Sequence, residues 1–423
     1  MVSRAQTGNL LRKKLQQGGG WVCGCDPAGL TIRRGFAFVS AGEITESVMP
    51  DDFEVIVAGL GAMGSAAVHH LAARGRRVLG LDRFQPPHQF GSSHGLTRII
   101  REAYFEHPLY VPLIQRAYEL WAELESKSGR SLLQPTGGLM IGPRDGVLVS
   151  GAERSAREHR LTHKILSAEE TRRQFPALNP AENMTAVWEP RAGILFPERI
   201  IQTHLELAAQ NGAALRFNDP ALRWEPRGDG VRVFTATHAY DARRLLLSAG
   251  AWMSSLVPDL KLPLTVERQV LFWFEPSAQA ELFQPARCPV HLWEYATHQF
   301  FYGFPDLGDG VKVALHHQGE ITSPDLVRRE VGEKEIAAMR KLLRRFVPHA
   351  EGRLKSTAVC VYTNTPDEHF ILDHHPVHRQ VLITSPCSGH GFKFSSVVGE
   401  LAATLLEDQT PPFDLSLFAL GRF

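Results

Sequence analysis

Val55-Ile-Val-Ala-Gly59-Leu-Gly61-Ala-Met-Gly64 is the stretch that decides the fold, because an apolar run leads here into three glycines at fixed spacing. The run over 53–58 is short and rich in valine and isoleucine, as in a strand buried on both faces. Gly59 permits a tight turn, Gly61 lets the backbone approach a pyrophosphate, and Gly64 lets the next helix pack against the strand. The segment therefore predicts the opening of a βαβ unit that binds a dinucleotide.

An acidic residue follows where a ribose would need an acceptor. A helix is expected over 65–74 and a second strand over 77–81, and this strand ends at Asp82. A carboxylate in that place can accept hydrogen bonds from ribose hydroxyls. The glycine motif alone does not separate FAD from NAD. Its place between a strand, a helix and an acid nevertheless favours dinucleotide binding over a fortuitous glycine turn.

The pattern along the rest of the chain predicts an α/β (α+β) fold with two interleaved domains. Further elements of a nucleotide-binding domain are expected at 109–124, 200–209, 214–217, 231–235, 245–248, 381–384 and 395–406. Short runs rich in aromatic and β-branched residues, typical of an antiparallel sheet, lie at 269–274, 290–295, 299–304, 311–317 and 357–362, with a helix at 333–346. We therefore expect a Rossmann-like domain over 51–135, 196–262 and 365–423. A substrate domain with a mixed or antiparallel sheet is expected over 136–195 and 263–364.

Length and composition exclude several classes of protein. A chain of 423 residues is long for one core, and 43% hydrophobic with 22% charged residues is ordinary for a globular protein. The net charge of +1 gives no case for a nucleic-acid or membrane partner. No stretch reaches the ~18 consecutive apolar residues of a membrane span. The substrate must therefore be recognised by local chemistry.

The cysteines indicate neither a disulfide framework nor a metal site. The five are odd in number and scattered, at Cys23, Cys25, Cys288, Cys360 and Cys387. Cys23-Gly-Cys25 has no second Cys or His pair nearby at zinc spacing, so no metal is predicted. Free thiols fit a reducing compartment, and we expect the cytoplasm.

The segment over 1–48 differs from the rest of the chain. It is basic and has no apolar core, so a secretory signal is not expected. It could be an organelle transit peptide or a disordered extension from an upstream start codon, since Met49 stands just before the first strand. We favour the extension.

Three further motifs contain charged or nucleophilic residues, beside glycines in the first and the last. They are Gly91-Ser-Ser-His94-Gly-Leu-Thr-Arg98-Ile-Ile-Arg101, Cys360-Val-Tyr362-Thr-Asn-Thr-Pro-Asp-Glu368-His369-Phe and Ser388-Gly389-His390-Gly391-Phe392-Lys393. Arginine suits forked recognition of a carboxylate, and a thiolate is a nucleophile. By chemistry alone, solvated surface charges and a packed core cysteine would be the simpler interpretation.

Together and in this order, the motifs resemble the monomeric sarcosine oxidase family, which includes N-methyltryptophan oxidase and pipecolate oxidase. The resemblance runs from about Asp52 to Phe423. It implies an FAD-binding domain like those of p-hydroxybenzoate hydroxylase and D-amino-acid oxidase, with a sheet-based catalytic domain. It also implies a monomer that oxidises secondary amino acids, such as sarcosine or N-methyl-L-tryptophan, with O₂ and releases hydrogen peroxide.

The resemblance assigns roles to single residues. Cys360 would carry the flavin through an 8α-thioether, and Lys312 would promote the reaction with O₂. Arg101 and Lys393 would hold the substrate carboxylate. Arg98 and His94 would lie against the flavin, while Tyr302 and His316 would face the substrate. The residues expected to bind FAD are Gly59, Gly61, Gly64, Asp82, Gly250, Cys360, Gly389, Gly391 and Lys393.

The chain departs from the family pattern in two places, and two other functions remain open. Pro386-Cys387 stands where Gly-Phe is usual, and Trp293 stands where relatives have smaller side chains, so we expect a reshaped pocket and leave the substrate open. A related dehydrogenase with a protein or quinone acceptor is the runner-up, against which Lys312 argues. A non-catalytic flavoprotein scaffold would need no carboxylate clamp, so Arg101 and Lys393 argue against it.

Overall fold

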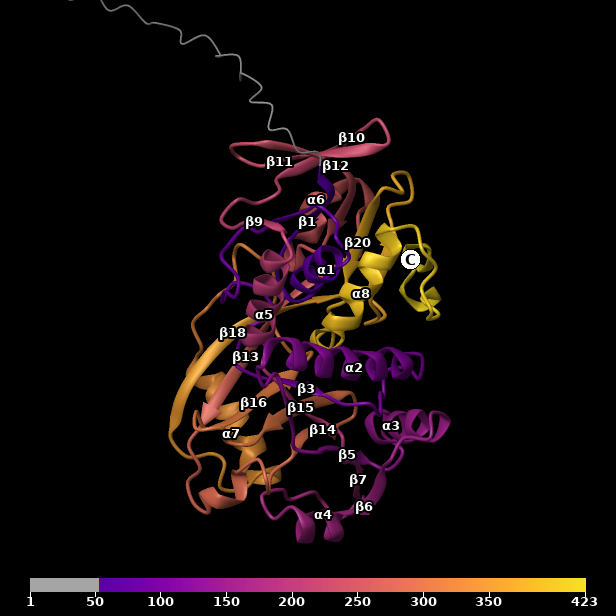
Figure 1. Ribbon diagram of the computed structural model, residues 1–423. Coiled ribbons are helices and arrows are strands. Elements are labelled where there is room, and N and C mark those ends of the chain that lie inside the picture. The colour runs from indigo at the N-terminus through magenta and orange to yellow at the C-terminus, as the bar shows by residue number, and fades with distance from the viewer. Residues whose placement is uncertain (1–52) are drawn as a thin grey trace, which may run out of the picture. The chain divides into compact units, whose positions relative to one another are not determined.

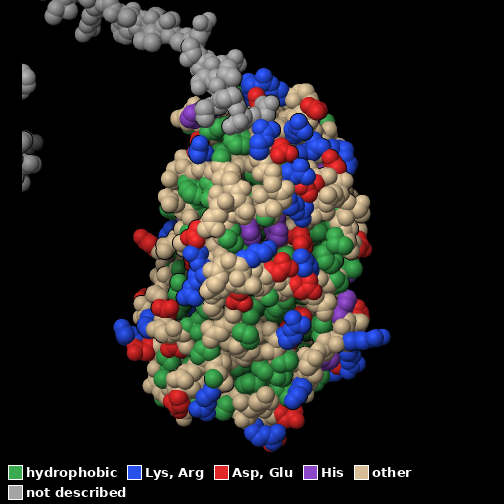
Figure 2. Space-filling view, in the orientation of Figure 1, with side chains coloured by type: hydrophobic (Ala, Val, Ile, Leu, Met, Phe, Trp, Pro, Cys, Tyr) green, Lys and Arg blue, Asp and Glu red, His purple; other side chains and the backbone are tan. Residues whose placement is uncertain are grey.

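The computed structural model describes residues 53–423, in which three β-sheets are connected by helices (Figure 1). The expectations for the leader over 1–48, for Met49 and for Cys23-Gly-Cys25 lie outside the described residues. Acidic and basic side chains are mixed over the face seen in Figure 2, in keeping with a net charge of +1. Within residues 53–423, no helix has the length and apolar character that a membrane span requires.

The first sheet has eight strands and is built around β1 (Phe53–Ala58). β1 lies parallel to β2 (Val78–Leu81) on one side and to β12 (Ala239–Leu247) on the other. The other strands are β9 (Ala214–Arg216), β10 (Arg223–Arg227), β11 (Gly230–Phe234), β19 (Ile371–His374) and β20 (Val381–Ser385). The parallel order β9-β2-β1-β12-β20 sets the carboxyl ends of β1 and β2 side by side, as the glycine motif predicts.

The second sheet has nine strands and is mixed. Its strands are β5 (Gly138–Pro143), β6 (Lys164–Ser167), β7 (Met184–Glu189), β13 (Thr265–Phe274), β14 (Val290–Ala296), β15 (Gln299–Phe304), β16 (Val311–His316), β17 (Ile321–Thr322) and β18 (Leu354–Asn364). The antiparallel pattern expected for this region is correct except where β14 lies parallel to β5. β18 pairs with all of β13, and the register sets Gln269 opposite Cys360.

A third sheet of three short strands joins distant parts of the chain. β8 (Gly193–Leu195) lies between β3 (Arg98–Ile100) and β4 (Leu133–Pro135), antiparallel to both. Strands of three residues show no periodicity, so the sequence does not predict this sheet. It fixes Arg98 at the start of β3 and places Arg101 directly after its end.

Helices cover the first sheet and run across the middle of the molecule. α1 (Ala62–Ala73) packs against both α5 (Pro197–Gln210) and α8 (Ser395–Leu406), and α2 (Tyr110–Ser128) crosses below α8 (Figure 1). The remaining helices are α3 (Val147–Glu158), α4 (Ala168–Gln174), α6 (Met253–Leu256) and α7 (Glu333–Phe346). Single 3₁₀ turns that matter for the site are η1 (Gly250–Trp252) and η4 (Phe392–Phe394).

The predicted fold class is confirmed, and every strand and helix predicted within residues 53–423 occurs at or near its expected position. α7 and α8 occupy the predicted ranges 333–346 and 395–406 without change. The domain boundaries stay a prediction. Strand membership supports them, because β5–β7 and β13–β18 share one sheet while β19 and β20 belong to the other.

The contact between α1 and α8 depends on a glycine. A Cβ atom added at Gly399 would lie 2.6 Å from the Cβ of Ala66 and 2.8 Å from the backbone nitrogen of Ala67. Distances this short do not occur between such atoms, so any side chain at 399 must push the two helices apart. Small residues at this crossing are therefore a requirement of the packing.

We expect Gly399→Val to destabilise the protein by about 1–3 kcal/mol, the usual cost of overpacking a close contact. Gly421→Val is the control, because a Cβ at Gly421 meets no atom within 4 Å and its backbone is unstrained. Thermal unfolding followed by circular dichroism measures both. Equal melting temperatures for the two variants would contradict the packing requirement.

Candidate active site

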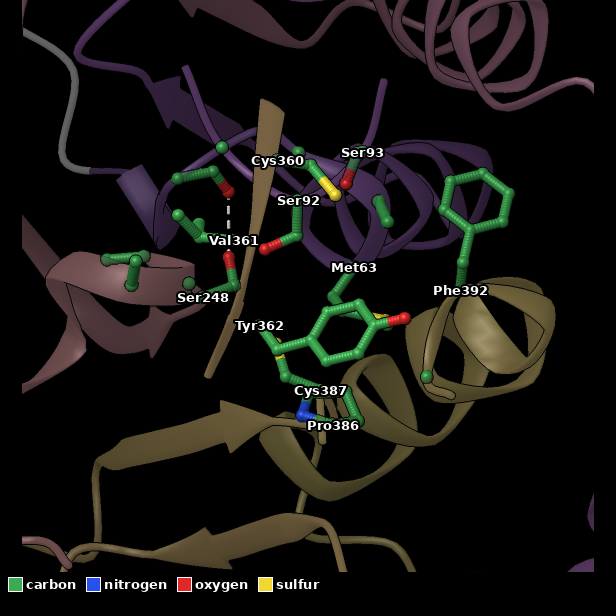
Figure 3. Close-up of a pocket in the computed structure, with 18 of the residues that line it drawn as sticks. Met63, Ser92, Ser93, Ser248, Cys360, Val361, Tyr362, Pro386, Cys387 and Phe392 are labelled. Atoms are coloured by element: carbon green, nitrogen blue, oxygen red, sulfur yellow. Dashed lines mark hydrogen bonds between the residues drawn. The ribbon is translucent and has the colours of Figure 1, made fainter. Parts of the chain in front are cut away.

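A cavity of about 510 Å³ is lined by residues from all three sheets. Figure 3 shows Met63 of α1, Cys360 and Tyr362 of β18, and Phe392 of η4 around it. The predicted site residues in its lining are Gly59, Gly61, Asp82, Arg98, Arg101, Gly250, Tyr302, His316, Cys360, Gly389, Gly391 and Lys393. Gly64, His94 and Lys312 are not in the lining and stand behind it. Segments from both ends of the chain therefore meet in one place.

The loop after β1 is too tight for side chains. Gly59 has a φ of +96°, and a Cβ there would lie 2.5 Å from the carbonyl oxygen of Ser248. A Cβ at Gly64 would lie 1.8 Å from the carbonyl oxygen of Gly59. The Ser248 hydroxyl donates a hydrogen bond to that same oxygen at 2.7 Å. The loop can thus present bare backbone to a phosphate group.

Asp82 ties this loop to the end of β2. One of its carboxylate oxygens accepts the Leu60 N–H at 2.6 Å and the other accepts the Phe84 N–H at 2.8 Å. Burial raises the pKa of Asp82, although both N–H groups act in the opposite direction. Gly250, with a φ of +53°, begins η1 on the other side of the cavity. Both residues line the cavity.

Arg98 fixes the conformation of the loop before β3. Its guanidinium donates to the carbonyl oxygens of Ser92, His94 and Thr97 at 2.6–2.7 Å. His94 is buried behind this loop, and burial together with the charge of Arg98 lowers its pKa to about 3. The wall of the cavity is therefore formed by a permanent cation backed by a neutral histidine.

Lys312 is fully enclosed on the sheet side of the same loop. Its Nζ lies 2.6 Å from the carbonyl oxygen of Gly95, 2.8 Å from that of Thr97 and 2.9 Å from the Thr97 hydroxyl. Burial, and then Arg98, lower the pKa of Lys312 well below its ordinary value. Against this, three acceptors match the three N–H donors of an ammonium group. We regard this geometry as favouring the charged form.

Cys360 is a free thiol in the cavity wall. It is buried on β18 and belongs to a small apolar cluster with Leu271 of the adjacent strand β13 and Ala314 of β16. Burial raises the pKa of Cys360, while Arg98 and Lys312 act to lower it. Two cations near a buried thiol make its thiolate more accessible than burial alone would allow.

Arg101 and Lys393 are brought together at one aromatic ring. The Arg101 guanidinium carbon lies 4.2 Å from the centre of the Tyr104 ring, and the Lys393 Nζ lies 5.4 Å from it. Both cations are buried. Burial, and then the charge of Arg101, lower the pKa of Lys393 to about 7. This pair was predicted from opposite ends of the chain, and the structure places both residues in the same cavity.

Glu106 is a partner of Arg101 that sequence analysis missed. Its two carboxylate oxygens accept hydrogen bonds from one Arg101 nitrogen at 2.7 and 2.8 Å. Burial raises the pKa of Glu106, but Arg101, His390 and Lys393 outweigh burial and leave it below its ordinary value. One ionised acid thus faces two basic groups.

His316 and Tyr302 stand on neighbouring strands at the other side of the cavity. Their rings are 6.2 Å apart, and the His316 Nδ1 lies 3.1 Å from the Tyr362 hydroxyl. Burial, and then the charge of His317, lower the pKa of His316 well below its ordinary value, so it is neutral. Gly389 packs against this cluster, since a Cβ there would lie 2.6 Å from the Tyr362 ring.

Other residues of the site carry little signal in the sequence. Tyr104 and Glu106 follow Arg101 closely, and a search for side chains around the arginine could have found them. His390 stood in a quoted motif, but its 2.6 Å approach to the Tyr104 hydroxyl depends on the tertiary fold.

The expectation that Trp293 reshapes the pocket is wrong. Trp293 does not line the cavity, and it is fully buried in the core of the second sheet. Its ring stacks on Phe301 and its Nε1 donates to His291 at 2.8 Å. The side chain points to the face of β14 that α7 covers, away from the site. Pro386 and Cys387, in contrast, do line the cavity.

Comparison with known proteins identifies the family. The profile of the FAD dependent oxidoreductase family matches residues 54–405, which is most of the chain. The chain belongs to this family.

Several relatives in the family are similar over nearly their whole length. The monomeric sarcosine oxidase of Streptomyces avermitilis is 46% identical over 374 residues, which cover 88% of this chain and 97% of that protein. The N-methyl-L-tryptophan oxidase of Yersinia pestis is 35% identical, with 88% and 100% covered. The solved structure of NikD, an unusual amino acid oxidase, has a TM-score of 0.76 at 23% identity and covers 87% of this chain and 97% of its own. This last likeness shows the fold.

The cavity has the residues that FAD requires. The side-chain-free loop at Gly59 and Gly64 would hold the pyrophosphate, and Asp82 would hold a ribose. Arg98 would lie beside the isoalloxazine ring, which gains negative charge on reduction. These features fit the FAD dependence that family membership establishes.

Proposed function

We propose that the protein is an oxidase of secondary α-amino acids, either N-methylated or cyclic, with FAD attached to Cys360. The observation that carries the proposal is the pair Arg101 and Lys393, two basic groups buried at one ring in the cavity that Cys360 also lines. Similarity to a monomeric sarcosine oxidase and an N-methyl-L-tryptophan oxidase supports this substrate class. FAD, when bound, supplies a ring that accepts a hydride from the substrate and later gives electrons to O₂.

Arg101 and Lys393 would bind the substrate carboxylate. Glu106 alone cannot neutralise both basic groups, so an anion entering the cavity meets a favourable potential. The binding of this carboxylate would fix the orientation of the amine relative to the cofactor. It also explains a preference for amino acids over simple amines.

The surrounding residues would keep the substrate amine neutral. A protonated amine has no lone pair with which to drive departure of a hydride. Arg101 and Lys393 disfavour a further positive charge, and His316 is neutral. The amine proton can therefore leave as the substrate settles in the site.

Lys312 would assist the reduction of O₂ to hydrogen peroxide. The first electron transferred to O₂ creates a negative charge, and a fixed ammonium group stabilises that charge as it develops. The three oxygen acceptors around the Lys312 Nζ keep this group in place. For the chain as a whole, we propose a monomer, as the name of the Streptomyces relative states for that protein. We also propose a cytoplasmic location, in keeping with the free thiols of the described residues.

Flavin absorbance tests the proposed function directly. Sarcosine, N-methyl-L-tryptophan and L-pipecolate are added to the purified protein without oxygen, and air is then admitted. We expect bleaching by at least one substrate and rapid recovery in air. Bleaching with slow recovery would indicate a dehydrogenase, and no bleaching across a broad amine panel would indicate a scaffold.

Cys360 should keep the flavin on the polypeptide after acid denaturation. A thioether replaces one thiol hydrogen and one hydrogen of the flavin methyl group, and O₂ takes up the two electrons and two protons as hydrogen peroxide. We expect Cys360→Ala to release all flavin into the supernatant, whereas Cys387→Ala, which alters another thiol lining the cavity, should retain it. Peptide mass spectrometry locates the attachment. Free flavin from the parent protein would refute it.

Removing either basic group should weaken carboxylate binding by about 1.5–3 kcal/mol, the scale of a charge-assisted hydrogen bond. Arg101→Met and Lys393→Met are compared with Arg116→Met, which removes a surface guanidinium paired with Glu400. Because the pKa of Lys393 is about 7, its charge, and the affinity that depends on it, should fall as the pH rises through that value. Ligand analogues without a carboxylate that bind equally well would contradict the clamp.

Lys312→Met should separate the two half-reactions. The substitution keeps the length of the side chain and removes its charge, so bleaching by substrate should stay within about tenfold of the parent rate, whereas reoxidation in air should slow at least ~10²-fold. Lys355→Met is the control, since its Nζ bonds an exposed carbonyl of Gly308. Stopped-flow absorbance measures both steps, and equal slowing of the two would assign Lys312 a structural role.

A further inference from the structure

Glu189, at the end of β7, is a fully buried acid bound to the chain that carries Arg101. One carboxylate oxygen accepts the backbone N–H of Glu102 at 2.6 Å, and the other accepts that of Ala103 at 2.8 Å. None of the ion pairs found within residues 53–423 involves Glu189. Its hydrogen bonds therefore go to two successive peptide groups.

These peptide groups need an acceptor because regular structure ends just before them. β3 stops at Ile100, and residues 101–107 form neither helix nor strand. Buried N–H groups without a partner are costly. β8 brings Glu189 close to the segment after β3. Gly193 of β8 pairs with Ile100, and the turn before β8 begins at the residue after Glu189.

One residue, Ala103, connects Glu189 to Arg101. The N–H of Ala103 is held by Glu189, and the carbonyl oxygen of the same residue accepts a hydrogen bond from the Arg101 guanidinium at 3.0 Å. The guanidinium is thereby folded back on its own chain, over Tyr104 and toward Glu106. If the backbone of Ala103 moved, the guanidinium would lose its hydrogen bond to the Ala103 carbonyl oxygen.

We propose that Glu189 is a positioning residue for Arg101, which holds the guanidinium where it can receive the substrate carboxylate. This inference rests on the proposed function, in which Arg101 binds that carboxylate. Glu189 itself does not line the cavity and touches no substrate.

The charge of Glu189 makes a solely space-filling role a poor explanation. A buried carboxylate without a paired cation costs more than a neutral residue of the same size. The titratable and charged groups around it are Glu102, Arg101 and Tyr118, and Arg191 pairs with Glu102. Burial, and then the charge of Glu102, raise the pKa of Glu189 to about 7, although its two N–H partners and Arg101 act to lower it. As the pH falls through 7, the protonated oxygen stops accepting its N–H, so the hold on the loop weakens.

The test uses the flavin-containing enzyme and two ligands that cannot be oxidised. Methoxyacetate has the shape and carboxylate of sarcosine, and methoxyacetamide is its neutral counterpart. Dissociation constants come from the change in flavin absorbance, for the parent, Glu189→Gln, Arg101→Met and Glu102→Gln. Glu102→Gln is the matched control, because its side chain is also buried but contacts Arg191 and none of the held peptide groups.

We expect Glu189→Gln to bind methoxyacetate about tenfold more weakly, the loss of one of two charge-assisted hydrogen bonds, with methoxyacetamide affinity and the maximal rate of flavin reduction little changed. The decline in methoxyacetate affinity below pH 7 should disappear in this variant, while the decline above pH 7, due to Lys393, should persist. Glu102→Gln should bind methoxyacetate as tightly as the parent where Glu189 is ionised, and its decline in affinity at low pH should begin at a lower pH, because the charge of Glu102 no longer raises the pKa of Glu189.

Three results would overturn the inference. The first is methoxyacetate binding by Glu189→Gln that equals that of the parent, and the second is an equal loss of affinity for both ligands. If Glu189→Gln does not fold, absence of the acidic limb in the parent enzyme would be the third. When Arg101→Met weakens methoxyacetate binding and Glu189→Gln does not, only the positioning role fails. When Arg101→Met has no effect, the carboxylate clamp of the proposed function fails as well.

Discussion

The structure depends above all on holding two basic groups, Arg101 and Lys393, inside the protein at a single aromatic ring. Burying an unpaired charge costs several kcal/mol even after relaxation. The face of Tyr104, the Glu106 carboxylate and nearby backbone carbonyls reduce that cost. They do not remove it, because one acid faces two bases. The pKa of Lys393 therefore falls to about 7, and an anion in the cavity would be expected to favour its charged form.

The three-stranded sheet brings the components of this site together. β3, β4 and β8 contain only three residues each, yet they connect the loop of Arg98 and Arg101 to the end of β7 in the large mixed sheet. α1 and α8, in close contact at Gly399, bring the residues before α8 against the glycine loop after β1. The first sheet thus provides the dinucleotide end of the cavity and the second provides Tyr302, His316 and Cys360. Neither sheet contains the whole site.

Sequence analysis succeeded where the signal is local. The tight loop after β1 follows from the spacing of its glycines, and the structure explains that spacing by distances too short for a Cβ. Asp82 lies at the end of β2 as expected and accepts the Leu60 and Phe84 N–H groups, while its role toward a ribose stays a prediction. Arg101 and Lys393 came from resemblance, since nothing in the pattern of 98–101 or 388–393 says that these segments meet. Glu189 had no signal, because its contact with residues 102 and 103 depends on strands too short to show a period. The prediction for Trp293 failed because the sequence shows the size of this side chain but not the direction in which it points. The alternation of side chains along β14 directs it into the core.

The hydrogen bonds of Lys312 determine whether it can act as a proton donor. Its ammonium group has three N–H bonds, and three oxygen atoms of Gly95 and Thr97 already accept them. It has no proton left to offer a molecule on the other side of the loop. Across this loop Lys312 can act only through its electrostatic potential. That potential falls with distance and does not depend on the direction from which a molecule approaches. Lys312 can therefore set the local electrostatic potential without acting as an acid, and in the proposed reduction of O₂ the protons would come from water or from another residue.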